Sequence, residues 1–252
     1  MKNKISIFLI LFILTTIPTN VFAASYEVNR DLTIEIDNSD WITFTKDDIN
    51  NSKLKELNIN YNDIRSEIEE NNIYLESFLI NNKNRQENIS LFIKISEDKM
   101  DIGNLHSYPK EKINSIGSNL LKSEIIKADN FTIYENDYAF IKFEYQDNNY
   151  NLYQFYTYIN GHMYAFSFQK ENKISLSEKN MMNNIVDNIE FQLDEDFEQA
   201  IDFSSTFEKA ITAGIIGAIT AGIFTIMVFK KEKDKQKKVF KFKYNKKLYI
   251  TC

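Results

Sequence analysis

Cysteine is almost absent from this sequence, because the single residue, Cys252, is the last of 252. A fold stabilised by internal disulfides is therefore excluded, and so are the cysteine clusters of structural zinc sites. Glycine and proline are also scarce, at six and two residues. Gly103, Gly117 and Gly161 are isolated from one another, so the chain has no glycine-rich loop that could surround a phosphate.

Histidine is nearly as rare. His106 and His162 are far apart in the sequence, and neither has a second histidine or a cysteine at the spacing of metal ligands. His162 directly follows an Asn-Gly pair, so we expect a strand-end residue beside Ile159. His106 precedes Pro109 and is expected in a loop or at the entry to a helix. The sequence therefore predicts no catalytic residue, no metal ligand and no cofactor.

Carboxylates are plentiful, and the densest cluster comprises Asp194, Glu195, Asp196, Glu198 and Asp202. Oxygen ligands suit Ca²⁺, so a weak calcium site is one interpretation, although the cluster lacks the ordered spacing of a calcium-binding loop. We favour the alternative, a solvated acidic segment at residues 193–209.

Two segments with long apolar runs, one near each end of the chain, are typical of an exported membrane protein. Residues 1–24 combine two lysines, a short apolar run and small residues at a cleavage position, which is the pattern of a secretory signal peptide. Residues 210–229 contain no charge, proline or amide side chain. At about 1.5 Å rise per residue, a helix of this length covers the ~30 Å hydrocarbon core of a bilayer. A buried core helix is the alternative, but little chain follows it, so we expect a transmembrane helix at 210–229.

The charges indicate how that helix is oriented. Residues 230–252 contain ten lysines against two carboxylates, a net charge of +8. Subtracting this tail and the +2 of Lys2 and Lys4 from the total of −6 leaves −16 for the remainder. Basic residues beside a span stay cytoplasmic. We therefore expect a single-pass protein of the cell membrane, with the domain at 25–192 outside and the basic tail inside. An exported region with this charge, the domain together with the acidic segment, lacks the basic patch that nucleic acid requires.

Two features of the C-terminal region predict partners. Small residues recur every four positions along the expected span, at Ala210, Gly214, Ala218 and Gly222. Such a row lets two helix backbones approach closely, so self-association or packing against a partner helix is expected, the alternative being a monomer. Lysines lie among aromatic residues in the tail, at Lys237, Lys238, Lys241 and Lys243. They predict contact with anionic membrane lipid, the alternative being a solvated topogenic signal.

Between these segments, hydrophobic periodicity predicts alternating strands and helices. Strands are expected at 32–36 and 41–44, joined by a polar turn, and at 73–80 and 89–95, joined as a hairpin. Helices are expected at 47–70, with a break at Asn60 or Asn62, and from Pro109 to about residue 125, where Gly117 costs about 1 kcal/mol relative to alanine. Ser175 and Glu178 predict a capping box that starts a last helix.

The clearest pattern lies in residues 138–169, where Asn160-Gly161 between two alternating runs predicts a two-residue hairpin turn. That turn pairs Ile159 with His162 and Phe155 with Phe166. One face of the resulting sheet then carries Phe140, Tyr153, Phe155, Tyr164, Phe166 and Phe168. The other carries Ile141, Phe143, Leu152, Tyr156, Tyr158 and Met163. Because neither face is polar, we expect both to be covered.

The order of these elements resembles the PsbP/Mog1-like group of α/β/α domains over residues 26–191. The likeness comprises the early strand with Trp41, the helices, the meander with its Asn-Gly turn and the ending Asn188-Ile189-Glu190-Phe191. It implies an α+β fold in which a curved antiparallel sheet is flanked by helices. Members of the group are mostly accessory or binding proteins without a shared active site, so the resemblance implies a non-enzymatic module.

Taken together, these observations predict an extracytoplasmic binding or interaction module of the bacterial cell envelope. The expected partners are membrane lipid and an envelope protein or a second copy of the chain. Two alternatives remain open: an envelope hydrolase with a carboxylate pair that linear sequence does not reveal, and an accessory subunit of a transporter or signalling complex. Trp41 and the tyrosines of 150–164 could stack on sugars or peptides, but aromatic residues at strand spacing more often form core.

Overall fold

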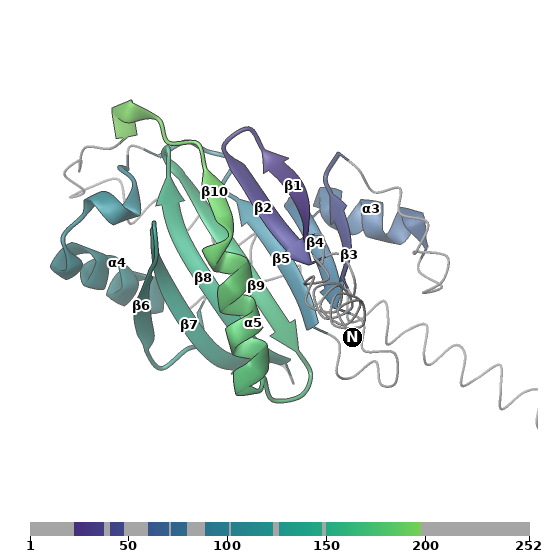
Figure 1. Ribbon diagram of the computed structural model, residues 1–252. Coiled ribbons are helices and arrows are strands. Elements are labelled where there is room, and N and C mark those ends of the chain that lie inside the picture. The colour runs from purple at the N-terminus through teal and green to yellow at the C-terminus, as the bar shows by residue number, and fades with distance from the viewer. Residues whose placement is uncertain are drawn as a thin grey trace, which may run out of the picture.

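The computed structural model describes residues 23–37, 41–47, 60–70, 72–79, 89–100, 102–122, 126–147 and 150–197. These residues form a mixed α+β fold with two antiparallel sheets and few helices (Figure 1). None of the helices among them is long and apolar enough to cross a membrane. Almost all of the expected signal peptide, the span at 210–229 with its row of small residues, and the basic tail lie outside the described residues.

The larger sheet has seven strands, all antiparallel, in the order β3-β4-β5-β9-β8-β7-β6. They are β3 (Trp41–Thr45), β4 (Ile73–Leu79), β5 (Ile89–Ile95), β6 (Phe131–Glu135), β7 (Ala139–Asp147), β8 (Tyr150–Ile159) and β9 (His162–Lys170). The smaller sheet has the order β1-β2-β10 and comprises β1 (Ala23–Asn29), β2 (Leu32–Asp37) and β10 (Ile189–Phe191). The helical elements are α3 (Tyr61–Glu70), α4 (Lys110–Lys122), α5 (Leu176–Asp187) and the short 3₁₀ turns η2 (Leu105–Ser107) and η3 (Glu195–Phe197).

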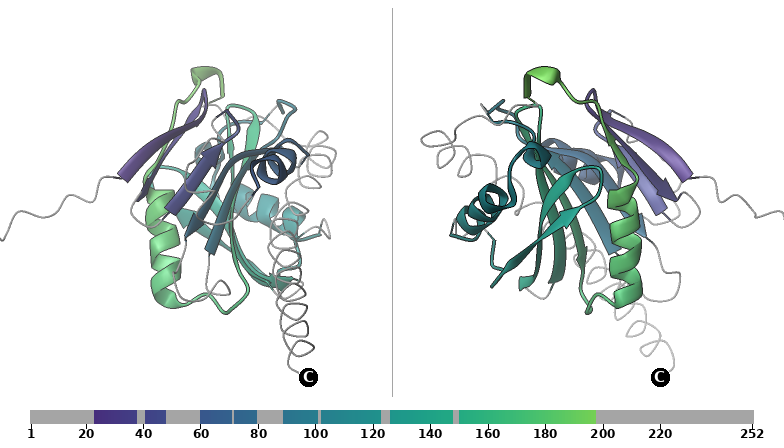
Figure 2. Two further views of the ribbon diagram at one scale, coloured as in Figure 1. Left: turned by 90° about the vertical axis from the view of Figure 1, so that its right-hand side faces the viewer. Right: turned by 60° about the vertical axis from the view of Figure 1, so that its left-hand side comes forward.

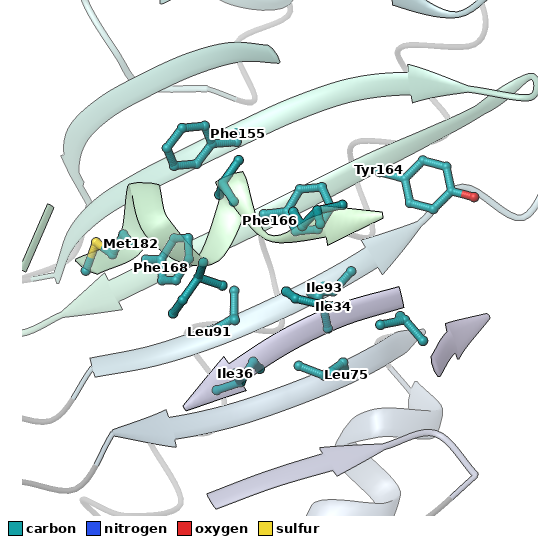
Figure 3. Close-up of a cluster of buried hydrophobic side chains, with 14 of the residues drawn as sticks. Ile34, Ile36, Leu75, Leu91, Ile93, Phe155, Tyr164, Phe166, Phe168 and Met182 are labelled. Carbon is teal, nitrogen blue, oxygen red and sulfur yellow. The ribbon is translucent and has the colours of Figure 1, made fainter. Parts of the chain in front are cut away.

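The larger sheet is covered on both faces, as the apolar pattern predicts. Helix α5 and the smaller sheet lie against one face, whereas α3 and α4 lie against the other (Figure 2). The first face buries Phe155, Phe166 and Phe168 beneath Met182 of α5 and Ile34 of β2 (Figure 3). The opposite face is divided, because α4 packs over the strands β7 to β9 and α3 packs over β3 to β5.

The hairpin at Asn160-Gly161 has the predicted register. Ile159 pairs with His162 and Phe155 with Phe166, and both turn residues have positive φ, at 51° and 80°. Both predicted faces of this sheet are confirmed, since each set of six residues lies in a separate core. The capping box is also confirmed: Ser175 Oγ accepts from Glu178 N, and the Glu178 side chain accepts from Ser175 N.

The strands predicted at 32–36 and 41–44 both form, and the structure assigns them to different sheets. Strand β2 belongs to the smaller sheet and β3 to the edge of the larger one. Strand β2 does alternate, with its apolar side chains buried, whereas β3 is buried along most of its length. The connection between them therefore changes sheets. Strands β1 and β6 were not predicted, and both are partly exposed edge strands with few fully buried side chains.

The described parts of the helices agree with their predicted cores. Helix α3 begins at Tyr61, directly after Asn60, whose Oδ1 accepts a hydrogen bond from Asn62 N at 3.0 Å. The expected helix at 47–59 lies mostly outside the described residues. Helix α4 buries Ile113, Ile116 and Leu120, as its spacing predicts. The Gly117 position is explained by packing: a Cβ there would lie 2.5 Å from the ring of Phe131 on β6.

Candidate functional site

The aromatic residues that could have stacked on a sugar or peptide are mostly part of the core. Trp41 is buried in the core with 3% exposure, and Tyr153, Tyr156, Tyr158 and Tyr164 are equally enclosed. Their ring faces are therefore closed to a sugar or peptide. Aromatic residues at strand spacing form core here, as the sequence analysis favoured.

The two histidines contact different residues. His162, half-buried at the start of β9, has Nδ1 3.0 Å from the carbonyl oxygen of Ser96. Since a carbonyl only accepts, this hydrogen bond holds the proton on Nδ1. His106 lies in η2 with its ring edge-on to Tyr138, at 6.1 Å between centroids. Both therefore lie where the sequence places them, at a strand end and at the approach to a helix.

The acidic cluster is only partly within the described residues, since Glu198 and Asp202 lie outside them. Asp194, Glu195 and Asp196 enter the turn η3, where Asp194 Oδ1 accepts from Asp196 N at 3.1 Å. No group of residues in the described part of the chain has the arrangement of a metal site. The described portion of the cluster thus caps its own turn.

The Asn160-Gly161 turn does more than reverse the chain. Asn160 is 4% exposed, and its side-chain amide binds the backbone of the segment that leaves the domain. Asn160 Nδ2 donates to Gln192 O at 2.7 Å, and Asp194 N donates to Asn160 Oδ1 at 2.8 Å. An asparagine amide has the donor and acceptor of a peptide group, so it pairs with two backbone groups two residues apart as a neighbouring strand would. We call residues 192–197 the exit segment.

Further contacts fix the exit segment against the hairpin tip. Asn104 accepts from Asn160 N through its side-chain Oδ1 at 2.8 Å, and its own N–H donates to Phe197 O at 2.9 Å. Lys99 Nζ lies 4.2 Å from the Phe197 ring centroid, within the range of a cation–π contact. Gly161 is required by this packing as well as by its φ, since a Cβ would lie 2.6 Å from Met100 O. Three segments distant in sequence therefore converge at one turn.

A second polar cluster is buried on the α4-covered face of the larger sheet. The hydroxyls of Tyr145 and Tyr156 both donate to Gln154 Oε1, at 2.9 and 3.1 Å, and Gln154 Nε2 donates to Ser167 Oγ at 2.9 Å. Burial raises the pKa of both tyrosines well above 10.0. Because these groups satisfy one another, the network helps to specify the sheet register.

Two charged residues in the same sheet escaped the sequence analysis. Glu76 on β4 is fully buried, and Lys94 on β5 is 7% exposed. Glu76 pairs with Phe92, two residues before Lys94, so both side chains lie on one face of the sheet. The only sequence signal was a single charge within each apolar strand.

The surface candidate lies on β6, β7 and β8 beside α5. Lys142 on β7 is half-buried, and its Nζ is 5.4 Å from the ring centroids of both Tyr134 and Tyr153. Lys142 pairs with Thr132 on β6 and with Phe155 on β8, so the two tyrosines are its diagonal neighbours. Each such cation–π contact contributes about 0.5–1 kcal/mol at a partly exposed site.

Helix α5 holds these tyrosines in place. The Tyr134 hydroxyl donates to Asp187 Oδ1 at 2.7 Å, and the Tyr153 hydroxyl donates to Asn183 Oδ1 at 2.9 Å. Lys179, one turn earlier on the helix, pairs with Glu144 of β7 and also lies 5.8 Å from the Tyr153 centroid. We call Tyr134, Lys142, Glu144, Tyr153 and Lys179 the Lys142 patch.

The electrostatics distinguish Lys142 from the lysines of the domain that form ion pairs. Burial lowers the pKa of its ammonium, and the nearby charge of Lys179 lowers it further, whereas Glu144 opposes the change. Within the described residues no carboxylate lies within ion-pair distance of Lys142, in contrast to Lys110, Lys127, Lys170 and Lys179. The patch therefore contains a positioned ammonium group that forms no ion pair within the described part of the chain. Sequence reasoning missed it because its partners come from three strands and a helix.

Comparison with known proteins adds no assignment: no protein-family model matches the chain, and no curated protein matches its sequence.

Proposed function

We propose that the chain is a membrane-anchored, extracytoplasmic binding or interaction module of a bacterial cell envelope, without enzymatic activity. The observation that supports this most directly is the docked exit segment. Residues that lead toward the expected span at 210–229 bind the tip of the central hairpin through Asn160. Because the segment that leads to the anchor is bound to the domain, the domain can present a surface in a fixed orientation to the membrane.

The length of the connection bounds the geometry of this proposal. Twelve residues, 198–209, separate the exit segment from the expected span. A chain of this length reaches at most about 40 Å when fully extended. The hairpin tip would then face the membrane from nearby, and the opposite end of the sheet, with the start of α5, would face away.

The fold gives the proposal its second support. An antiparallel sheet with α5 on one face and α3 and α4 on the other has the layers of the PsbP/Mog1-like group, whose members mostly bind partners. The smaller sheet β1-β2-β10 covers part of the α5 face in addition to the helix. We propose that this chain is a distant relative of that group with an added sheet.

The expected partners remain part of the proposal. The row Ala210, Gly214, Ala218 and Gly222 would contact a second copy or a partner helix in the bilayer, and the tail lysines Lys237, Lys238, Lys241 and Lys243 would contact anionic lipid. Both contacts would be additional to the binding of a partner by the extracytoplasmic domain.

Single-cysteine labelling in intact cells tests the topology. Leu176 is 75% exposed at the start of α5, so Leu176→Cys combined with Cys252→Ala provides one thiol, on the domain. We expect a membrane-impermeant maleimide to label this variant in intact cells. The wild-type chain, whose only thiol is that of Cys252, should be labelled only after permeabilisation. Labelling of both chains before permeabilisation, or of the wild-type chain alone, would contradict an external domain with an internal tail.

A further inference from the structure

Lys142 combines three features that point to a ligand. Its ammonium group lies between the rings of Tyr134 and Tyr153, which prevents the side chain from moving freely. It has no carboxylate within ion-pair distance in the described part of the chain. Its neighbours on the outer side, Thr132 and Glu144, are exposed, so the position can be reached from solvent.

Two acidic groups beside the patch are already engaged. Glu144 pairs with Lys179, and Asp187 accepts the hydroxyl of Tyr134. Lys142 and Lys179 both lie near the ring of Tyr153, so two ammonium groups are held over one aromatic ring. Like charges held together repel each other, and that repulsion is relieved when an anionic group lies between them.

We propose that Lys142 and Lys179 form a binding site for an anionic oxygen group, a carboxylate or a phosphate monoester, presented by the partner of this interaction module. This inference rests on the proposed function and names the chemistry that the module recognises. The anion would accept hydrogen bonds from both ammonium groups. The tyrosine rings, held by α5 through their hydroxyls, would keep the lysines at a fixed separation.

The charge of the domain limits the kind of partner. The remainder of the chain outside the tail and the signal segment carries −16, so a long polyanion is repelled before it reaches the patch. The site therefore suits a single anionic group on a neutral or basic partner. A polyphosphate or nucleic acid chain does not fit this description.

Competitive acylation of the full-length, detergent-solubilised protein tests the site. An N-hydroxysuccinimidyl ester labels accessible amines, and peptide mass spectrometry measures the rate at each lysine. We expect inorganic phosphate or acetate to slow labelling of Lys142, while the exposed Lys122 of α4 is unaffected. If the dissociation constant is about 1 mM, about 10 mM of the anion would slow the reaction roughly tenfold.

The two anions distinguish the possible ligands. Protection by phosphate alone indicates a phosphate monoester, and protection by acetate alone or by both anions indicates a carboxylate-sized oxygen group. Unchanged labelling of Lys142 in both, or equal slowing at Lys122, would overturn the proposal. These results do not depend on the topology, which the maleimide experiment tests separately.

Two variants separate binding from simple shielding. Lys179→Gln removes the second ammonium and leaves Lys142 available for labelling, so we expect the protection by the anion to disappear. Tyr134→Phe keeps the aromatic ring but removes the hydrogen bond to Asp187, and we expect weaker protection. Full protection in Lys179→Gln would refute the two-lysine site even if Lys142 alone binds the anion. Circular dichroism of each variant confirms that the fold is retained.

Discussion

Replacement of Asn160 tests the central structural claim, that one asparagine joins the hairpin tip to the exit segment. Asn160→Ala removes the hydrogen bonds to Gln192 O and from Asp194 N. Both backbone groups belong to exposed residues, so water can replace the lost partner, and each bond is worth about 1 kcal/mol. Alanine at a φ of 51° costs about 1 kcal/mol more. We therefore expect a loss of about 3 kcal/mol.

Asn160→Gly is the matched control for this variant. Glycine adopts positive φ without strain but lacks the amide, so it isolates the two hydrogen bonds and should cost about 2 kcal/mol. The bond from Asn160 N to Asn104 Oδ1 involves only the backbone of residue 160 and should persist in both variants. For a domain of this size, each kcal/mol lowers Tm by about 2–4 °C, so alanine should lower it by about 6–12 °C.

Hydrogen exchange of the exit segment gives a second, local measurement. If the segment opens without global unfolding, the lost 2 kcal/mol should accelerate exchange at the Asp194 amide about thirtyfold. The reasoning is refuted if Asn160→Gly lies within about 0.5 kcal/mol of the wild type, the range of ordinary surface substitutions, and exchange is unchanged. The segment would then be held by other contacts.

Three further predictions follow from the packing and the titrating groups. Gly117→Ala should lower the free energy of unfolding by about 1 kcal/mol in chemical denaturation, although alanine has the higher helix propensity, because the new methyl group overpacks against Phe131. Adding Phe131→Leu should restore stability, since the smaller side chain leaves room for the methyl group. Burial alone would raise the pKa of Glu178, but hydrogen bonds hold the pKa below 4.5, so the stability of the fold should fall as the pH drops below that value. In melting curves measured over a pH series, Glu178→Gln should show a smaller loss. Burial raises the pKa of Tyr156 and Tyr158 far above 10.0, so the folded state should lose stability as the pH rises beyond 10. The ultraviolet signal of their ionisation should appear only together with unfolding. Ionisation before unfolding would show that these tyrosines are accessible to solvent.

Much of the sheet was predictable from local pattern. The Asn160-Gly161 turn fixes register, because only a few residue pairs tolerate positive φ in both positions, and a register once fixed assigns every later side chain to one face. The apolar character of both faces then required two covering layers, which the structure has. The capping box at Ser175 and Glu178 was equally local, since its four atoms lie within four residues.

The assignment of β2 and β3 to different sheets was not predictable in this way. Alternation specifies which side chains of a strand are buried but not which sheet buries them. Edge strand β6 escaped detection for a related reason, because its half-buried residues give a weak alternation. Gly117 shows the same limit: helix propensity assigns it a cost, whereas the ring of Phe131 from another element makes the small residue necessary.

The sequence by itself determined the elements whose signals are local: the central hairpin, the two-sided burial of its strands and the cap of α5. Only the tertiary structure decided the two candidate sites. Asn160 reads as a turn residue until Gln192 and Asp194 are brought to its side chain. Lys142 reads as one exposed lysine among many until two diagonal tyrosines and a helix surround it. The physical reason is that periodicity reports the environment of each side chain within its own element, whereas a site depends on groups that meet only when separate elements pack.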